Sequence, residues 1–139
     1  MALKIIVDTM HIVGILSDTI YLSVAEAIDQ KKIDAVISVI SLTELIKILG
    51  KYDLDKTKTT ITQLKSSNLE IKPLDTSIAE EAGYIRLKYN IPTADSLIGA
   101  TGIICKADHI LSNDDHFNSI KSLIKPIDLN KLLKLIKKL

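Results

Sequence analysis

The 139-residue sequence contains a single cysteine, Cys105, and no tryptophan. One cysteine cannot form a disulfide within the chain, and a zinc site would need several cysteine or histidine ligands at close spacing. We therefore expect Cys105 to be a small buried side chain in a reducing environment.

Long hydrophobic runs are also missing, although 47% of the residues are hydrophobic. No run approaches the roughly 18 residues that a membrane span requires. The first strand-like run begins within three residues of Met1, which leaves no room for a secretion signal, so we expect a cytoplasmic protein. The length suits one domain spanning residues 1–139, and the surplus of apolar residues predicts an interface with a second copy or another protein.

The net charge of +1 gives the chain little general attraction for nucleic acid. Contact with phosphate would need a local basic patch or a bridging metal ion. The best patch is "KLLKLIKKL" at residues 131–139, where lysines and leucines alternate at helical spacing. We interpret it as the solvated lysine face of a terminal helix.

Several catalytic motifs are absent from the sequence. It has no G-x-x-x-x-G-K-S/T or G-x-G-x-x-G loop for nucleotides and no G-x-S-x-G nucleophile motif. The histidines His11, His109 and His116 have no serine or cysteine nearby in a nucleophile context. We expect His109 and His116 to pack against neighbours, although His116 lies near several acids and could contact a substrate.

Short runs of β-branched residues alternate with helical patterns along the chain. The runs predict strands within residues 3–7, 34–40, 69–75, 109–112 and 122–127, the last of them a weak edge strand. Helices are expected at residues 9–16, 18–32, 41–50, 53–67, 75–89 and 92–105, followed by the basic terminal helix. Strands joined by helices pair in parallel through right-handed crossovers, so the sequence predicts a three-layer α/β/α fold with a doubly wound, mainly parallel sheet of about five strands.

Four acidic residues lie where predicted strands end or the following helices begin. Asp8 ends the first strand, Glu44 follows the second, Asp95 opens the helix after "NIPT", and Asp114 follows "HILS". In open parallel sheets ligands bind at the carboxyl ends of the strands. We therefore expect the four carboxylates to meet at one edge of the sheet.

Each of these acids also has a local structural explanation. Asp8 could cap a helix, Glu44 could form a capping box with Ser41, Asp95 could interact with a helix dipole, and Asp114 could close a turn. Clustering is harder to explain, because two unit charges 4 Å apart repel by about 4 kcal/mol at an effective dielectric near 20. A Mg²⁺ or Mn²⁺ ion would remove that repulsion and could activate water for attack on a phosphodiester.

Four segments, "IIVDT", "SVISLTELIK", "IPTADSLIGAT" and "ADHILSNDDHF", resemble the motifs of the PIN-domain ribonucleases and, within them, the small VapC-type toxins. The resemblance covers the whole chain and implies a PIN-like fold and a Mg²⁺- or Mn²⁺-dependent endoribonuclease, commonly dimeric and inhibited by a small antitoxin. It assigns metal binding and catalysis to Asp8, Glu44, Asp95 and Asp114. Thr9 and Ser112 become supporting hydroxyl groups, and Asp115 is a weaker candidate for substrate contact.

Two positions depart from the family pattern. Met10 stands where the family often has asparagine, and Ser112 replaces the usual threonine but keeps its hydroxyl group. The alternative function is a PIN-fold module that binds RNA or protein without turnover. A phosphoacceptor receiver domain is disfavoured, because it would need an acidic pair at the end of the first strand, where Asp8 stands alone.

Overall fold

The computed structural model describes residues 2–139, which fold around one sheet of five parallel strands. The strands lie side by side in the order β3-β2-β1-β4-β5. In chain order they are β1 (Leu3–Val7), β2 (Ile33–Ser38), β3 (Glu70–Lys72), β4 (His109–Leu111) and β5 (Lys125–Ile127). The predicted parallel sheet, with its last strand at an edge, is confirmed.

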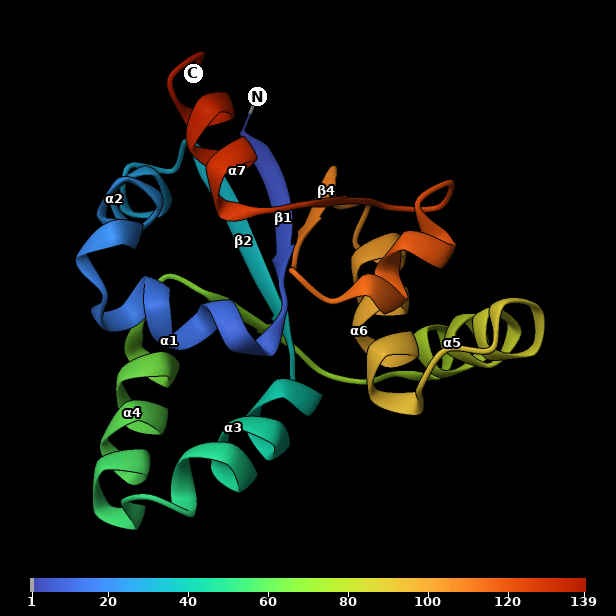
Figure 1. Ribbon diagram of the computed structural model, residues 1–139, viewed down its shortest axis with the longest axis horizontal. Coiled ribbons are helices and arrows are strands. Elements are labelled where there is room, and N and C mark those ends of the chain that lie inside the picture. Colours follow the sequence, from blue (N-terminus) through green and yellow to red (C-terminus); the bar gives the residue numbers. More distant parts are fainter. Residues whose placement is uncertain (1) are drawn as a thin grey trace.

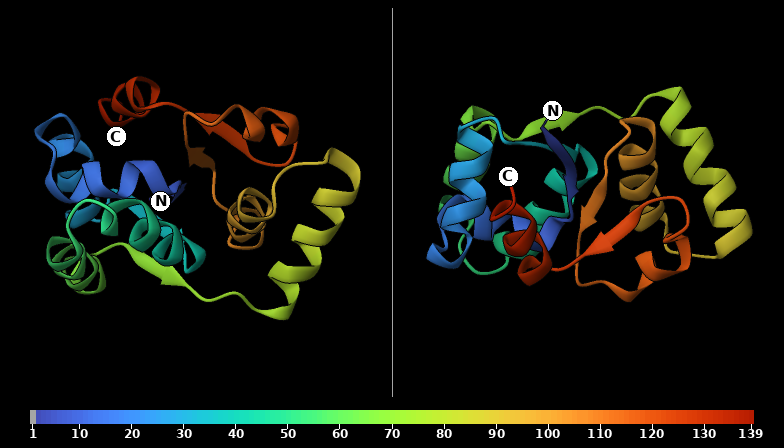
Figure 2. Two further views of the ribbon diagram at one scale, coloured as in Figure 1. Left: turned by 60° about the horizontal axis from the view of Figure 1, so that its bottom comes forward. Right: turned by 90° about the horizontal axis from the view of Figure 1, so that it is seen from above.

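Helices cover both faces of the sheet and give the three predicted layers (Figures 1 and 2). One face carries α1 (Thr9–Ser17), α2 (Leu22–Asp29), α4 (Leu54–Ser66) and α7 (Leu129–Ile136). The other face carries α5 (Thr76–Tyr89), α6 (Thr93–Ile104) and the 3-10 helix η2 (Asp115–Ile120). The central strand serves both cores, because Ile5 and Val7 face one and Ile6 faces the other, all fully buried.

The predicted helix over residues 18–32 is wrong in its extent. The segment is a 3-10 turn, η1 (Thr19–Tyr21), followed by the shorter α2. Asp18 caps the turn by accepting a hydrogen bond from the backbone N–H of Ile20 at 3.1 Å. After α2, Lys31 adopts a left-handed backbone with φ of 61°, which ends the helical path before β2.

The helix α6 packs closely against its neighbours through its small residues. A Cβ atom on Gly102 would lie 2.7 Å from Ile6 of β1, so this glycine allows the helix to approach the sheet. A Cβ atom on Gly99 would instead meet Ile120 of η2. Cys105 was expected to be buried, but it is partly exposed, and the preceding Ile104 is 41% exposed, because the helix ends there and the chain turns away.

Among residues 2–139, no single helix is long and apolar enough to cross a membrane. One pair of consecutive helical segments, Thr9–Ser17 and Thr19–Asp29, reaches that length and composition together, but the two segments are bent by 94° relative to each other.

The chain order of the strands puts a topological switch point, where parallel sheets form their ligand crevices, at the carboxyl ends of β1 and β4. From β1 the chain first builds outward through β2 and β3, and it then returns to add β4 and β5 on the other side. Parallel sheets bind ligands at such a switch point, because the connections on its two sides diverge there. Asp8 directly follows β1 and Ser112 directly follows β4, and the backbone N–H of Asp8 donates to the carbonyl of Leu111 at 3.0 Å.

Candidate metal centre

Asp8 lies at the switch point and is only 9% exposed. Its Oδ1 accepts a hydrogen bond from the backbone N–H of Thr9 at 2.8 Å, which caps α1. Its Oδ2 accepts a hydrogen bond from the Ser112 hydroxyl at 2.6 Å. The predicted capping role is therefore real, but it uses only one of the two oxygens. Each carboxylate oxygen has further lone pairs, so Asp8 can still bind a cation.

Glu44 approaches Asp8 from α3 (Ile40–Gly50), which begins just beyond β2. Its Oε1 accepts a 2.6 Å hydrogen bond from the Thr9 hydroxyl, whose oxygen also lies 2.9 Å from the hydroxyl of Ser41. The capping box expected between Ser41 and Glu44 is wrong, since the residue before α3 is Val39 and no side chain caps the helix. Ser41 is inside the helix and buried, and both side chains turn toward Thr9.

Asp95 and Asp114 lie on the other side of the crevice, together with His116. Asp95 is in the first turn of α6, and Asp114 caps η2 by accepting from the backbone N–H of His116 at 2.9 Å. The imidazole Nδ1 of His116 is 2.7 Å from Oδ2 of Asp95 and 3.0 Å from Oδ1 of Asp114. Ligand atoms of the three residues all lie within 4.8 Å of one another.

The expectation that His116 packs against neighbours is wrong, because 53% of its side chain is exposed. It stands at the acidic pair because η2 turns the chain straight after Asp114. Sequence reasoning placed His116 near the acids but could not see this turn. The signal was its position two residues after Asp114, where a tight turn brings both side chains to the same place.

The pKa values of Asp95 and His116 are both raised. Burial raises the pKa of Asp95, and the charges of Asp114 and Asp8 raise it further, against the opposing hydrogen bond from His116. The hydrogen bond to Asp95 raises the pKa of His116, and the charge of Asp114 acts in the same direction. The pocket therefore favours a positive group between Asp95 and Asp114, the place that His116 now faces with Nδ1.

Hydrogen bonds join the two sides of the crevice. The Ser112 oxygen that donates to Asp8 also accepts from the backbone N–H of Asp114 at 2.9 Å. Asp114 then meets Asp95 through His116, and Asp8 meets Glu44 through Thr9. The four predicted acids thus belong to one continuous network at one edge of the sheet, with Thr9 and Ser112 as its connecting hydroxyls.

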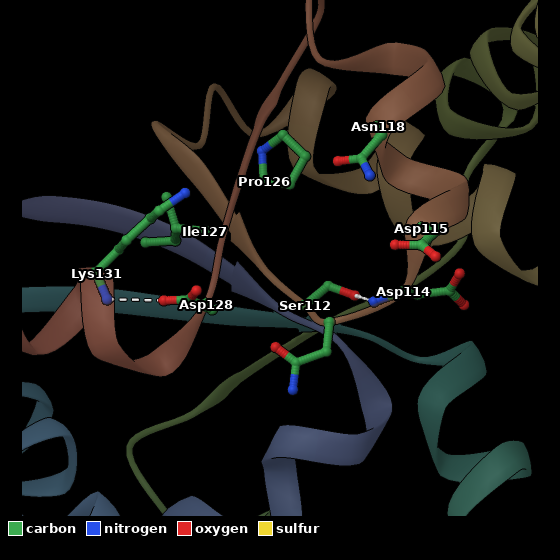
Figure 3. A pocket seen from close by; sticks show the side chains of 9 residues that line it. Ser112, Asp114, Asp115, Asn118, Pro126, Ile127, Asp128 and Lys131 are labelled. Atoms are coloured by element: carbon green, nitrogen blue, oxygen red, sulfur yellow. Dashed lines mark hydrogen bonds between the residues drawn. The ribbon is translucent and has the colours of Figure 1, made fainter.

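The network does not bring all four acids equally close. Within residues 2–139, the trio of ligand atoms formed by Asp95, Asp114 and His116 includes neither Asp8 nor Glu44. Asp115 is exposed, makes no side-chain hydrogen bond within the described chain, and points into a neighbouring hollow (Figure 3). Met10 is 69% exposed, so the position where the family often has asparagine faces solvent.

The donor set suits a hard divalent cation. Mg²⁺ and Mn²⁺ prefer carboxylate oxygens and retain several waters, so a few acids at an open crevice are sufficient. Asp95 and Asp114 offer ligand oxygens within 4.8 Å of each other, and the charge of Asp8 acts on Asp95. The N–H group of His116 occupies the position between two carboxylates that a cation would favour.

Comparisons with known proteins agree with this fold. A family model described as PIN domain matches residues 5–123. Among solved structures, VapBC2 from Rickettsia felis, bound to a DNA fragment from its promoter, aligns with a TM-score of 0.72 and 21% identity over 90% of this chain and 98% of that chain. VapBC-1 from nontypeable Haemophilus influenzae aligns with a TM-score of 0.71 and 19% identity over 91% of this chain and 98% of that chain. PAE2754 from Pyrobaculum aerophilum aligns with a TM-score of 0.68 and 15% identity over 100% of this chain and 98% of that chain. No match was found among curated protein sequences.

Proposed function

Because the chain belongs to the PIN-domain family, we propose that it is a metal-dependent endoribonuclease and the toxin of a toxin–antitoxin pair. PIN domains are generally nucleases, which gives the reaction class. The observation that carries the proposal is the convergence of Asp8, Asp95 and Asp114, from three distant segments, on one hydrogen-bonded network at the switch point.

In this proposal the metal ligands are Asp8, Glu44, Asp95 and Asp114, and Glu44 is held beside Asp8 through Thr9. A bound Mg²⁺ or Mn²⁺ would supply positive charge for the scissile phosphate and lower the pKa of a water nucleophile. Ser112 and the backbone of Thr9 fix the orientation of Asp8. The Thr9 hydroxyl holds Glu44 at the same edge, so that no acid needs to reorganise when RNA binds.

Each protein side chain has a separate proposed role. Asp95 is 14% exposed and Asp114 is 36% exposed, so these two acids line the opening through which a phosphodiester would enter. His116 is more exposed still and can move away from them when a cation takes its place. Its imidazole would then be free to donate a hydrogen bond to the substrate phosphate.

The proposed partners are RNA, a small antitoxin and a second copy of the chain. The titles of the similar structures name VapBC complexes and toxin–antitoxin complexes, which supports an antitoxin here. On α5, Tyr84 is 68% exposed and Leu87 is 85% exposed. These neighbours, three residues apart on one helix face, make α5 our proposed site of homodimer contact. We further propose that residues 1–139 form one PIN-like domain that works in the cytoplasm.

One observation favours the alternative, a PIN-fold module that binds without turnover. His116 already places a donor between Asp95 and Asp114, so the acidic pair has a stabilising partner when no metal is bound. A non-catalytic scaffold could therefore retain these acids without binding a metal ion. The two functions differ in one respect, since only the nuclease requires a divalent ion for an effect on RNA.

The test is RNA cleavage with Mg²⁺ or Mn²⁺ by the wild type, by Asp8→Asn and by Asp53→Asn. Asp53 is the matched control, because it caps α4 as Asp8 caps α1 and lies outside the site, and asparagine still caps a helix. We expect EDTA to abolish cleavage and Asp8→Asn to slow it by about 100-fold or more, with Asp53→Asn unaffected. Equal cleavage by both variants would exclude the mechanism.

A further inference from the structure

A hollow of about 270 Å³ opens beside the metal centre and shares Ser112 and Asp114 with it (Figure 3). One wall is η2, which contributes Asp115 and Asn118. The opposite wall is formed by β5 and the start of α7, with Pro126 and Asp128. We call this hollow the side pocket. Because it shares Ser112 and Asp114 with the metal centre, a polymer whose reacting bond lies at that centre would reach into it.

The polar groups of the side pocket are available for a ligand. Asn113, Asp115 and Asn118 are exposed, and within residues 2–139 their side chains form no hydrogen bond or salt bridge. Asp128 uses Oδ1 to accept from the backbone N–H of Lys131 at 2.8 Å, which caps α7, and its other oxygen is free. The two amides and these two carboxylates therefore line one space, beside Asp114, without hydrogen bonds to one another.

The charge of the side pocket selects which part of RNA it can hold. Asp115 and Asp128 would repel a phosphate group, so the sugar–phosphate chain must stay at the rim. The heterocyclic edge of a base, in contrast, offers N–H donors to these carboxylates. At about 270 Å³ the pocket is smaller than the usual 300–1,000 Å³ site of a drug-sized ligand, which suits one base, and the ring of Pro126 gives it an apolar wall.

The rim of the side pocket carries the positive charge that the phosphates would need. Among the described residues that line it, Lys131 is the one cation. Lys134 follows three residues later on the same side of α7. Both lysines are exposed, as predicted for this helix, and neither takes part in a salt bridge within residues 2–139.

From these observations we infer that the side pocket binds the base next to the scissile phosphate and prefers a base with an exocyclic amino group, while Lys131 and Lys134 bind the phosphates that follow. The inference rests on the proposed ribonuclease function and names its substrate preference. Carboxylates only accept hydrogen bonds, so Asp115 and Asp128 favour the amino group of cytosine over the carbonyl oxygen that uracil has in its place. Asn118 can pair with either donors or acceptors and completes the contact.

The test is the binding of fluorescein-labelled hexacytidylate and hexauridylate by the wild-type protein, measured by fluorescence anisotropy in EDTA at low salt. Cytosine presents its C4 amino group beside an unprotonated N3, whereas uracil presents a C4 carbonyl oxygen beside an N3–H, so the pair tests whether the pocket recognises the amino-bearing edge of cytosine. We expect cytidylate to bind at least about five-fold more tightly. The double variant Asp115→Asn/Asn118→Ala should reduce that ratio below about two-fold, and both positions are exposed, so the fold is preserved.

Lysine variants test the rim. Lys131→Ala should weaken binding of both RNAs by the same factor and reduce the slope of affinity against salt by about one. Lys58→Ala is the matched control, an exposed lysine in the middle of α4, and should change neither quantity. The inference is overturned if neither RNA binds, if both bind equally, if the preference survives the double variant, or if the two lysine variants behave alike.

This experiment separates the inference from the proposed function, because binding is measured without turnover. Selective binding by a protein that cleaves no RNA with Mg²⁺ or Mn²⁺ would refute the nuclease and leave the side pocket as a base-binding site. Metal-dependent cleavage together with equal binding of the two RNAs would support the nuclease function and refute the inference. Any base preference of the nuclease would then not arise in the side pocket.

Discussion

The hydroxyl of Ser112 donates a 2.6 Å hydrogen bond to Oδ2 of Asp8, although the two residues are 104 positions apart in the chain. Each directly follows a strand, and the strands β1 and β4 are neighbours in the sheet. The bond therefore spans the switch point. The hydroxyl oxygen of Ser112 also accepts a hydrogen bond from the backbone N–H of Asp114, so this one hydroxyl orients acids from both sides of the crevice.

The first prediction concerns Ser112. Ser112→Ala should weaken divalent metal binding and RNA cleavage by about 10- to 100-fold, the usual effect of removing a group that orients a metal ligand. Ser112→Thr keeps the hydroxyl and should retain most of both. Mn²⁺ titration by calorimetry, with cleavage rates beside it, measures the effect. Equal loss in both variants would mean that packing at this buried position matters and the hydroxyl does not.

The second prediction concerns the repulsion at Asp95. Burial and the charges of Asp114 and Asp8 raise its pKa, so its ionised form lowers the stability of the metal-free fold at neutral pH. Asp95→Asn removes the charge and keeps an acceptor for His116. In EDTA we expect a melting temperature about 2 to 5 °C higher, the shift that about 1 kcal/mol produces in a domain of this size.

Glu80→Gln is the control for that measurement, because it removes one negative charge from an exposed position on α5. It should leave the melting temperature in EDTA nearly unchanged. A melting temperature for Asp95→Asn that is unchanged or lower than that of the wild type would count against clustered charge. A rise of similar size in Glu80→Gln would point to the net charge of the whole chain.

The third prediction concerns the pH dependence of stability through His11, which is 4% exposed and has Nδ1 2.7 Å from the Tyr21 hydroxyl. Burial lowers the pKa of His11, against the opposing charges of Asp8 and Asp128. A histidine with a lowered folded pKa contributes stability that is fully present above its unfolded pKa of about 6.5, and this contribution is lost as the pH falls from that value through the lower folded pKa. Urea unfolding of the wild type should show that loss between pH 7.5 and 5.5.

His11→Gln cannot titrate, so the part of the loss that arises from His11 should be missing in this variant. The quantity compared is the slope of the free energy of unfolding against pH. A change in stability that is the same at every pH does not affect this slope. Identical pH dependence in the two proteins would show that other groups cause the loss.

The sequence predicted the fold well because its strands are short, apolar and buried on both faces. Ile5, Ile6 and Val7 leave little choice of structure, and helices between such strands require parallel pairing. Residues 18–32 were harder, since the pattern of apolar residues continues from the 3-10 turn η1 into α2 and does not distinguish the two kinds of helix.

The site was predictable in its acids and less so in their partners. Asp8 and Asp114 follow strands, so their meeting follows from sheet topology alone. The contact of Glu44 with Thr9 depends on where α3 begins, and a shift from Ser41 to Ile40 as the first helical residue is beyond sequence patterns. The position of His116 depends on a six-residue 3-10 helix, and such helices leave little periodicity to read.

The most direct test of the central claim, that these acids share a divalent cation, is calorimetric titration of Mn²⁺ into the wild type, Asp114→Asn and Asp115→Asn. The two substitutions are chemically identical and adjacent in sequence, but only Asp114 belongs to the group of close ligand atoms that it forms with Asp95 and His116. The account predicts that the wild type and Asp115→Asn bind Mn²⁺ with similar affinity and that Asp114→Asn binds it at least about ten-fold more weakly. A wild type that binds no Mn²⁺, or two variants that bind it equally, would contradict the claim.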